Sequence, residues 1–190
     1  MMDALADVRI ATDRLQLRPV AGADADAVFA LFNNWNVVRY LSAPPWPYAR
    51  TDAEDWIAMV TPPDDGNGES VFAITHAGAL VGVIGVRLRR ESDLQRGAGP
   101  NIGYWLGEPH WGHGYMTEAG RGFLPMVFDR LGSDMVYSGA FTENVASLRV
   151  QKKLGFEPAG ETMLFSRPRG GDYPHTNTAL TKTRFEALHR

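Results

Sequence analysis

The sequence predicts a single domain, residues 1–190, with a mixed α/β (α+β) fold. A chain of 190 residues fits one domain at the usual size of about 150 residues. Strand and helix patterns alternate along it, and a helical segment follows a strand that ends at Leu106. Such a crossover helix requires at least one parallel pair of strands. With 44% apolar and 22% charged residues, the chain has the composition of a globular protein that buries a core.

The first quarter of the chain predicts one strand, a helix, a loop and a second helix. Residues Ile10–Pro19 alternate apolar and polar side chains and end at a proline, which indicates a strand at a sheet edge. In Ala23–Phe32 the apolar residues recur at helical spacing. The segment Trp35–Arg50 holds too many prolines for a regular helix, so we expect a stiff aromatic loop that forms a pocket wall. Thr51 and Glu54 fit a capping box that starts the second helix.

The rest of the chain alternates strand patterns of period two with helical patterns. The predicted elements are a hairpin of Val71–Thr75 and Leu80–Leu88, a strand Ile102–Leu106, a helix Thr117–Leu131, a strand Met135–Phe141, a helix Asn144–Leu154 that ends at Gly155, and closing strands Glu157–Phe165 and Thr178–Lys182. Residues 170–175 are expected to connect the closing strands. Pro125 removes a helical hydrogen bond, so we expect a kink there.

Composition argues against several classes of function. The net charge of −3 gives no basic surface for nucleic acid. The longest apolar run, Leu80–Val86, is far shorter than the ~20 residues that cross a bilayer, and Asp3 and Asp7 do not fit a signal peptide. We therefore expect a cytoplasmic protein without nucleic-acid or membrane partners. The absence of cysteine excludes disulfides, a thiolate zinc site and an enzyme thioester.

Glycines are concentrated between Gly97 and Gly122, most densely in the segment Trp111–Thr117 between a strand and a helix. Backbone amides of such a turn, together with the positive end of the helix dipole, favour a phosphate group. The lysine of a P-loop is missing, and Thr117 replaces the third glycine of the dinucleotide-binding motif. A tight turn that simply starts a helix explains the glycines equally well.

Three segments resemble a known family: Thr12–Pro19, Tyr104–Ala119 and Asn144–Phe156. Together they resemble the GNAT superfamily of acyl-CoA-dependent N-acyltransferases, and within it the branch of ribosomal-protein N-terminal acetyltransferases. The resemblance implies a mixed central sheet, flanked by helices, that splays between the strand ending at Leu106 and the strand beginning near Met135. It also implies that acetyl-CoA lies in this opening.

The resemblance further implies which residues bind the cosubstrate and the acceptor. Amides of the glycine-rich turn would hold the pyrophosphate, and the end of the preceding strand would pair with the pantetheine arm. The implied cofactor-binding residues are Leu106, Gly112, His113, Gly114, Tyr115, Met116, Thr117 and Asn144. The implied acceptor-binding residues are Trp35, Tyr40 and Trp105, although packing over the sheet edge explains such aromatics equally well.

The catalytic groups implied by the resemblance are incomplete. The tyrosine that protonates the leaving thiolate in many relatives corresponds here to Gln151, and Ser147 matches the serine proposed for that task in the ribosomal-protein branch. A serine bonded to the carbonyl of residue 143 is the alternative. The glutamate that some members use as general base falls at Ser166. The remaining candidates for the base stay open: Glu108, His110, Glu143, Glu161 and Asp172.

We therefore expect an enzyme that passes an acetyl group from acetyl-CoA directly to a primary amine of a small molecule or a protein N-terminus. At pH 7 an α-amine is ~10% neutral and a lysine only ~0.04%, so the missing base favours an α-amine. The alternative is a non-catalytic module of the same fold that binds CoA or a peptide. His110 and His113 form a pair without a third ligand nearby in sequence, so we expect no metal.

Overall fold

The computed structural model describes residues 5, 7–61, 69–88 and 99–189. Asp3 and Gly97, on which parts of the sequence argument rest, lie outside these ranges. The strands are β1 Ile10–Ala11, β2 Leu15–Pro19, β3 Glu69–His76, β4 Ala79–Leu88, β5 Pro100–Leu106, β6 Met135–Phe141, β7 Glu157–Ser166 and β8 Gly171–Thr181. The helices are α1 Ala25–Phe32, α2 Trp35–Val38, α3 Arg50–Val60, α4 Tyr115–Leu131, α5 Val145–Leu154 and α6 Lys182–His189.

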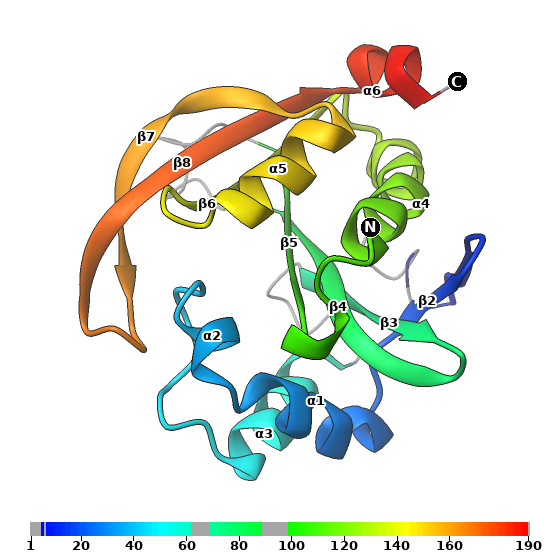
Figure 1. Ribbon diagram of the computed structural model, residues 1–190. Helices are drawn as coiled ribbons and strands as arrows, with labels where there is room; N and C mark the ends of the chain where they lie inside the picture. Colours follow the sequence, from blue (N-terminus) through cyan, green and yellow to red (C-terminus); the bar gives the residue numbers. More distant parts are fainter. Residues whose placement is uncertain (1–4, 6, 62–68, 89–98, 190) are drawn as a thin grey trace.

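The strands form one mixed sheet in the order β1-β2-β3-β4-β5-β6-β8-β7. Each neighbouring pair is antiparallel except β5 and β6, which run parallel and pair only at Asn101 and Tyr137. Beyond that pair the two strands separate, and β7 and β8 curve away from the rest of the sheet (Figure 1). The predicted fold class, the parallel pair and the splayed sheet are therefore confirmed.

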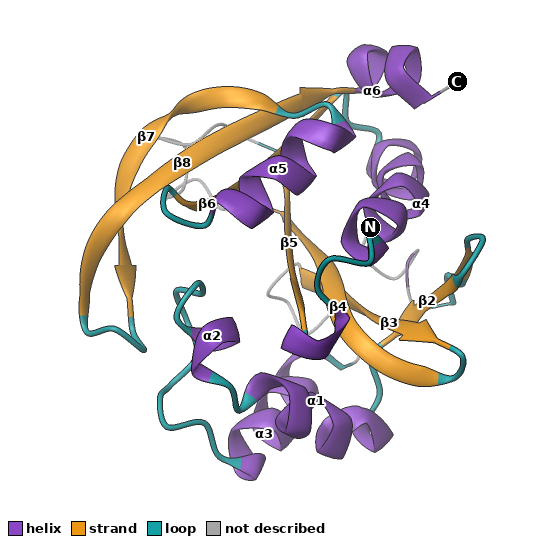
Figure 2. Cartoon of the chain, in the orientation of Figure 1, coloured by secondary structure: helices purple, strands orange, loops and turns teal. Residues whose placement is uncertain are grey.

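Helices cover both faces of the sheet and bury two apolar clusters. Because side chains alternate across a strand, Phe72 and Ile74 of β3 face one cluster while Val71 and Ala73 face the other. The first cluster lies against α4 and α6, and the second lies under α1, α2 and α3. Figure 2 shows α1–α3 together on one side and α4 and α5 on the other. The sheet is thereby held rigid on either side of the point where it opens.

The N-terminal elements differ from the sequence prediction in three respects. Ile10–Pro19 is not one strand: Ala11 and Gln16 pair across a turn, so the segment forms the β1–β2 hairpin. A short helix, α2, begins the aromatic loop at Trp35, ahead of its prolines. The second helix of the sequence prediction is α3, which begins at Arg50, and the Asp52 carboxylate accepts the Ala49 amide at 2.7 Å. The predicted capping box at Thr51 and Glu54 is thus wrong by two residues, because a neighbouring carboxylate takes the cap.

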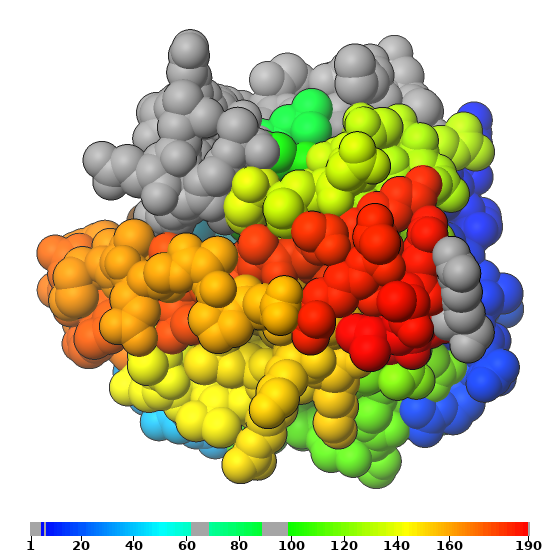
Figure 3. All heavy atoms as spheres, turned by 90° about the horizontal axis from the view of Figure 1, so that it is seen from above, coloured from blue at the N-terminus to red at the C-terminus, as the bar shows by residue number. Residues whose placement is uncertain are grey.

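The C-terminal elements are longer than predicted. Residues 171–175 belong to β8, which pairs with both β6 and β7, so only residues 167–170 connect the closing strands. The chain then continues as α6, which the sequence analysis did not predict. Seen from above, α6 lies beside the β7–β8 hairpin (Figure 3). Pro125 lies inside α4 without ending it.

Candidate active site

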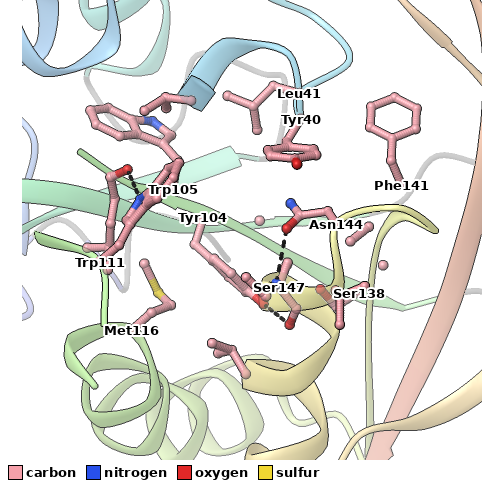
Figure 4. A pocket seen from close by; sticks show the side chains of 18 of the residues that line it. Tyr40, Leu41, Tyr104, Trp105, Trp111, Met116, Ser138, Phe141, Asn144 and Ser147 are labelled. Carbon is pink, nitrogen blue, oxygen red and sulfur yellow. Dashed lines mark hydrogen bonds between the residues drawn. The ribbon is translucent and has the colours of Figure 1, made fainter. Parts of the chain in front are cut away.

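A cavity of about 770 Å³ lies where β5 and β6 separate. Its walls come from β5, from the first turns of α4 and α5, and from the segment that follows α2. Figure 4 shows Tyr104 and Ser147 near its centre, with Met116 on one side and Tyr40 and Leu41 on the opposite side. Elements far apart in sequence therefore contribute to one site.

The glycine-rich turn forms one end of the cavity and presents free backbone amides. Gly112 and Gly114 have φ angles of +79° and +78°, a conformation that favours glycine. No side chain caps α4, although the first amides of a helix have no partner within the helix. A Cβ at Gly112 would meet no atom within 4 Å, and one at Gly114 would meet only Arg14 at 3.7 Å. Unpaired donors beside open space fit an anionic group such as a diphosphate.

The N-terminal hairpin fixes this turn in place. The Glu118 carboxylate in the first turn of α4 accepts hydrogen bonds from the Thr12 hydroxyl at 2.6 Å and from the Arg14 amide at 2.8 Å. The Arg14 guanidinium also bonds to Glu118 and donates to the His113 carbonyl at 3.1 Å. Burial alone would raise the pKa of Glu118, but these bonds lower it below its ordinary value. The segment Thr12–Pro19 thus holds the glycine-rich turn by hydrogen bonds, although the two lie about a hundred residues apart in sequence.

The edge of β5 that faces the opening offers backbone groups. Ser138 of β6 donates to the Ile102 carbonyl at 3.1 Å, which identifies the edge toward β6. Since backbone groups alternate in direction along a strand, those of Tyr104 and Leu106 point to the same edge. The Trp111 indole already donates to the Leu106 carbonyl at 2.8 Å. The amides of Tyr104 and Leu106 therefore face the cavity, as an extended ligand arm requires.

Ser147 lies in the first turn of α5 and belongs to a partly buried polar network. Asn144 caps the helix, because its side-chain oxygen accepts the Ser147 amide at 3.2 Å. The Ser147 hydroxyl lies 3.0 Å from the Tyr104 hydroxyl and 3.4 Å from Nε2 of Gln151. It does not bond to the carbonyl of residue 143, which instead accepts the Val145 amide. The predicted alternative of a serine bonded to that carbonyl is therefore wrong, and Ser147 lines the cavity.

Gln151 lies where many relatives carry the tyrosine that protonates the thiolate, and both ends of its side-chain amide have hydrogen-bond partners within the protein. Its Nε2 donates to the Gly139 carbonyl at 3.1 Å, and its Oε1 accepts from Thr178 at 2.8 Å. Burial raises the pKa of Tyr104, although hydrogen bonds to Ser147 and Gln151 oppose this effect, so its phenol stays neutral near pH 7. Sequence reasoning missed Tyr104 because the hydroxyl it meets is 43 positions away.

The remaining predicted residues fall partly inside and partly outside the cavity. Those that line it are Tyr40, Trp105, Leu106, Gly112, Gly114, Tyr115, Met116, Thr117, Asn144 and Ser147. His113 is not among the lining residues: its ring stacks on Tyr115 at 5.4 Å. Trp35 is also outside the lining, with its ring 5.3 Å from that of Trp46. The structure therefore does not bring these two side chains to the site.

Three of the candidate general bases line the cavity: Glu108, His110 and Glu143. Glu143 forms an ion pair with Arg169. The Glu108 carboxylate instead accepts the side-chain amides of Asn34 at 2.6 Å and Asn36 at 2.9 Å. Burial, together with the nearby histidines, lowers the pKa of His110.

Two further candidates for the general base, Glu161 and Asp172, are absent from the lining of the cavity. Ser166 lies buried, with its hydroxyl on the Leu41 carbonyl at 3.1 Å.

The described residues form neither a cluster of metal ligands nor a membrane-spanning helix. Within residues 5, 7–61, 69–88 and 99–189, no three His, Cys, Asp or Glu side chains gather closely enough to hold a metal ion. The helices in these ranges are too short or too polar to cross a membrane.

Comparisons with known proteins identify the family. A family model described as an acetyltransferase (GNAT) domain matches residues 14–157. YoaA of Bacillus subtilis (strain 168), an uncharacterized N-acetyltransferase, is 26% identical over 187 residues, which cover 91% of this chain and 96% of that protein.

Solved structures share the fold. RimJ of Mycobacterium smegmatis, in complex with CoA-disulfide, aligns with a TM-score of 0.80 and 22% identity over 96% of this chain and 90% of that one. A ribosomal-protein-S5-alanine acetyltransferase from Vibrio fischeri aligns with a TM-score of 0.77 and 17% identity over 94% and 99% of the two chains. The predicted enzyme class is confirmed at the level of the family: this chain belongs to the GNAT family of acetyltransferases.

Proposed function

We propose that this protein transfers the acetyl group of acetyl-CoA directly to a primary amine, specifically the α-amine of a small molecule or of a protein N-terminus. The observation that carries the proposal is the uncapped start of α4, which opens into the same cavity as the Ser147 hydroxyl. A single domain over residues 1–190 and a cytoplasmic location remain part of this proposal.

The binding role falls to backbone groups. The amides of the turn from Gly112 to Thr117 would hold the diphosphate, where charge-assisted hydrogen bonds are worth ~1.5 to 3 kcal/mol each. The amides of Tyr104 and Leu106 would hold the extended arm, and one of them would polarise the reacting carbonyl as an oxyanion hole does. When bound, acetyl-CoA supplies an activated acetyl group, so the enzyme needs no nucleophile of its own.

As the C–S bond breaks, Ser147 would donate its hydroxyl proton to the departing sulfur, and solvent would return a proton to the serine oxygen. Tyr104 would act as a positioning residue, because its neutral hydroxyl lies 3.0 Å from that of Ser147 and restricts its rotation. Gln151 supports the same hydroxyl from the other side at 3.4 Å. Ser147 itself lines the cavity in which the thioester would lie.

Glu108 would accept the proton that the amine loses, directly or through water. Its partners among the described residues are two neutral amides, whereas Glu143 is neutralised by Arg169. A carboxylate that keeps its negative charge also attracts an ammonium group before reaction. An α-amine, with a pKa near 8, needs only this modest help.

Titration calorimetry with acetyl-CoA tests the binding half of the proposal, and no binding at millimolar cosubstrate would contradict it. Release of free thiol from acetyl-CoA in the presence of amines and peptides tests the catalytic half. A module that only binds CoA or a peptide would give heat without thiol release. Mass spectrometry of products from a mixed amine library then identifies the acceptor.

A further inference from the structure

Arg39, which follows α2, carries a guanidinium without a counter-ion beside the cavity. Its Nε is buried and has no hydrogen-bond partner, and Arg39 is among the residues that line the cavity. Its guanidinium lies over the Tyr40 ring at 4.6 Å, and Nη2 donates to the Tyr40 hydroxyl at 2.7 Å. Among the described residues, no carboxylate lies within 4 Å of it. Arg39 therefore brings to the cavity a positive charge that no carboxylate of the described residues offsets, and such a charge favours binding of an anion.

Arg169 shows what a structural arginine looks like in the same part of the molecule. It lies between the Phe141 and Tyr173 rings, at 4.2 and 3.6 Å from their centroids. It also forms an ion pair with Glu143 and donates to Ser166. Its charge is thus neutralised within the protein, although one nitrogen, Nη2, also lacks a partner. Arg39 has only the hydroxyl and ring of Tyr40, and its charge remains uncompensated.

The position of Arg39 separates it from the diphosphate turn. Its neighbours Tyr40 and Leu41 lie across the cavity from Met116, at the start of α4 (Figure 4). The same segment is fixed to the β7–β8 hairpin, because the Leu41 carbonyl accepts the Ser166 hydroxyl at 3.1 Å and the Ser42 carbonyl accepts the Arg167 amide at 2.9 Å. Because Nη2 of Arg39 donates to the Tyr40 hydroxyl at 2.7 Å, the guanidinium lies on the Tyr40 side of the cavity, which the proposed function leaves for the acceptor.

We propose that Arg39 binds an anionic group of the acceptor, so that the preferred substrate is a primary amine that also carries a carboxylate or a phosphate. This inference rests on the proposed function. Arg39 would hold the anion with its fork of donors, while Glu108 attracts the ammonium, so that opposite charges in the cavity match opposite charges on the substrate. Neutral and purely cationic amines would lose the first of these contacts.

The test compares acceptors with and without the anion, and because the anion also changes the basicity of the amine, each ratio is read against the same ratio in an Arg39 variant. An equimolar mixture of amino acids and their amides is acetylated, and products are counted by mass spectrometry; phosphoethanolamine against ethanolamine forms the phosphate arm. We expect the ratio of acid to amide product, or of phosphate to alcohol product, to be about tenfold higher for the wild type than for Arg39→Gln. Arg39→Lys should give an intermediate ratio, since lysine keeps the charge without the fork. Which arm shows the preference identifies the anion.

Arg50→Gln is the matched control, because Arg50 pairs with Asp26 and Glu54 on the surface outside the cavity. It should leave the product ratio unchanged, and both variants should keep the affinity for acetyl-CoA within about twofold. The same ratio in Arg39→Gln as in the wild type would overturn the proposal. Weaker CoA binding in Arg39→Gln with an unchanged ratio would assign the arginine to the cosubstrate instead.

A binding measurement keeps this test separate from the proposed function. In CoA-saturated protein, calorimetry should show N-acetylated amino acids binding about tenfold tighter than their amides, and Arg39→Gln should remove the difference. Equal binding of acid and amide by the wild type would refute the role of Arg39 even if thiol release is observed. Failure to bind acetyl-CoA at all would instead refute the proposed function.

Discussion

The two helices that open into the cavity begin in different ways. α4 follows Gly114, with a φ of +78°, and no side chain caps its first turn, whereas α5 follows Asn144, whose side chain accepts the Ser147 amide. The first amides of any helix lack partners within it. In α5 the Asn144 side chain is such a partner, and in α4 no side chain takes this place. The contrast divides the proposed work: α4 binds the anion, and α5 orients a hydroxyl.

The largest effect is expected at the start of α5. Ser147→Ala removes the hydroxyl that we propose protonates the sulfur, so turnover should fall by about a hundredfold, within the usual range for a positioned acid. Affinity for acetyl-CoA should stay within about twofold, because the amides of α4 are untouched. Steady-state thiol release and calorimetry measure the two quantities. An unaltered turnover would remove Ser147 from the mechanism.

The Tyr104→Phe variant sharpens this test. If Tyr104 acts only through Ser147, its loss should lower turnover by less than Ser147→Ala does, and the double variant should be no slower than Ser147→Ala alone. Additive losses would show that the phenol acts independently of the serine.

The next effect is expected at the start of α4. Gly114→Val should weaken acetyl-CoA binding at least tenfold, since a β-branched residue is strained at positive φ and its side chain stands beside the diphosphate amides. Calorimetry measures the change. Gly132→Val is the control, because Gly132 caps the other end of α4 with a φ of +59°. Equal loss of affinity in both variants would mean that strain in the helix, and not the turn, causes it.

A smaller effect is expected at the α5 cap. Asn144→Ala should reduce the free energy of unfolding by about 1 kcal/mol, the usual cost of losing an N-cap, while Asn144→Ser should retain most of it. Urea unfolding measures both. If Asn144→Ser keeps the stability and still weakens acetyl-CoA binding, then Asn144 contacts the cosubstrate directly, beyond its role as a cap.

Local sequence pattern predicted elements whose signals are self-contained. The β6 bounds, Met135–Phe141, agree because turn residues flank its alternating pattern, and α5 agrees because Asn144 and Gly155 mark its ends. β8 was mostly missed because its first half is polar and contains Pro174, and this segment is stabilised by pairing with two strands. The Thr51 capping box failed because Asp52 could cap the same helix from another register.

The site residues also divide into those with a local sequence signal and those that depend on tertiary contacts. The turn before α4 could be located from the sequence because Gly112 and Gly114 are close together and both adopt positive φ angles. Tyr104 and Arg39 could not be located in this way, because their proposed roles depend on the tertiary structure. Tyr104 meets a hydroxyl on another element, and Arg39 has no carboxylate nearby among the described residues. Glu118 depends likewise on Thr12 and Arg14 in the distant hairpin.

The smallest effect concerns that last contact and the pH dependence of stability. Hydrogen bonds from Thr12 and Arg14 outweigh burial and lower the pKa of Glu118 in the folded protein. A carboxyl whose folded pKa lies below its unfolded value stabilises the fold above the unfolded value, and this contribution is lost as pH falls through the folded value. The wild type should therefore exceed Glu118→Gln in stability by a constant amount above about pH 5, and the difference should shrink below about pH 4.

Urea unfolding between about pH 3 and pH 7 measures this difference. Glu161→Gln, at an exposed position of β7, serves as the control for loss of one negative charge. A difference that stays constant down to the lowest pH would mean that Glu118 contributes through packing and not through its charge. In that case the β1–β2 hairpin would still hold the turn before α4, but the negative charge of Glu118 would not be needed to do so.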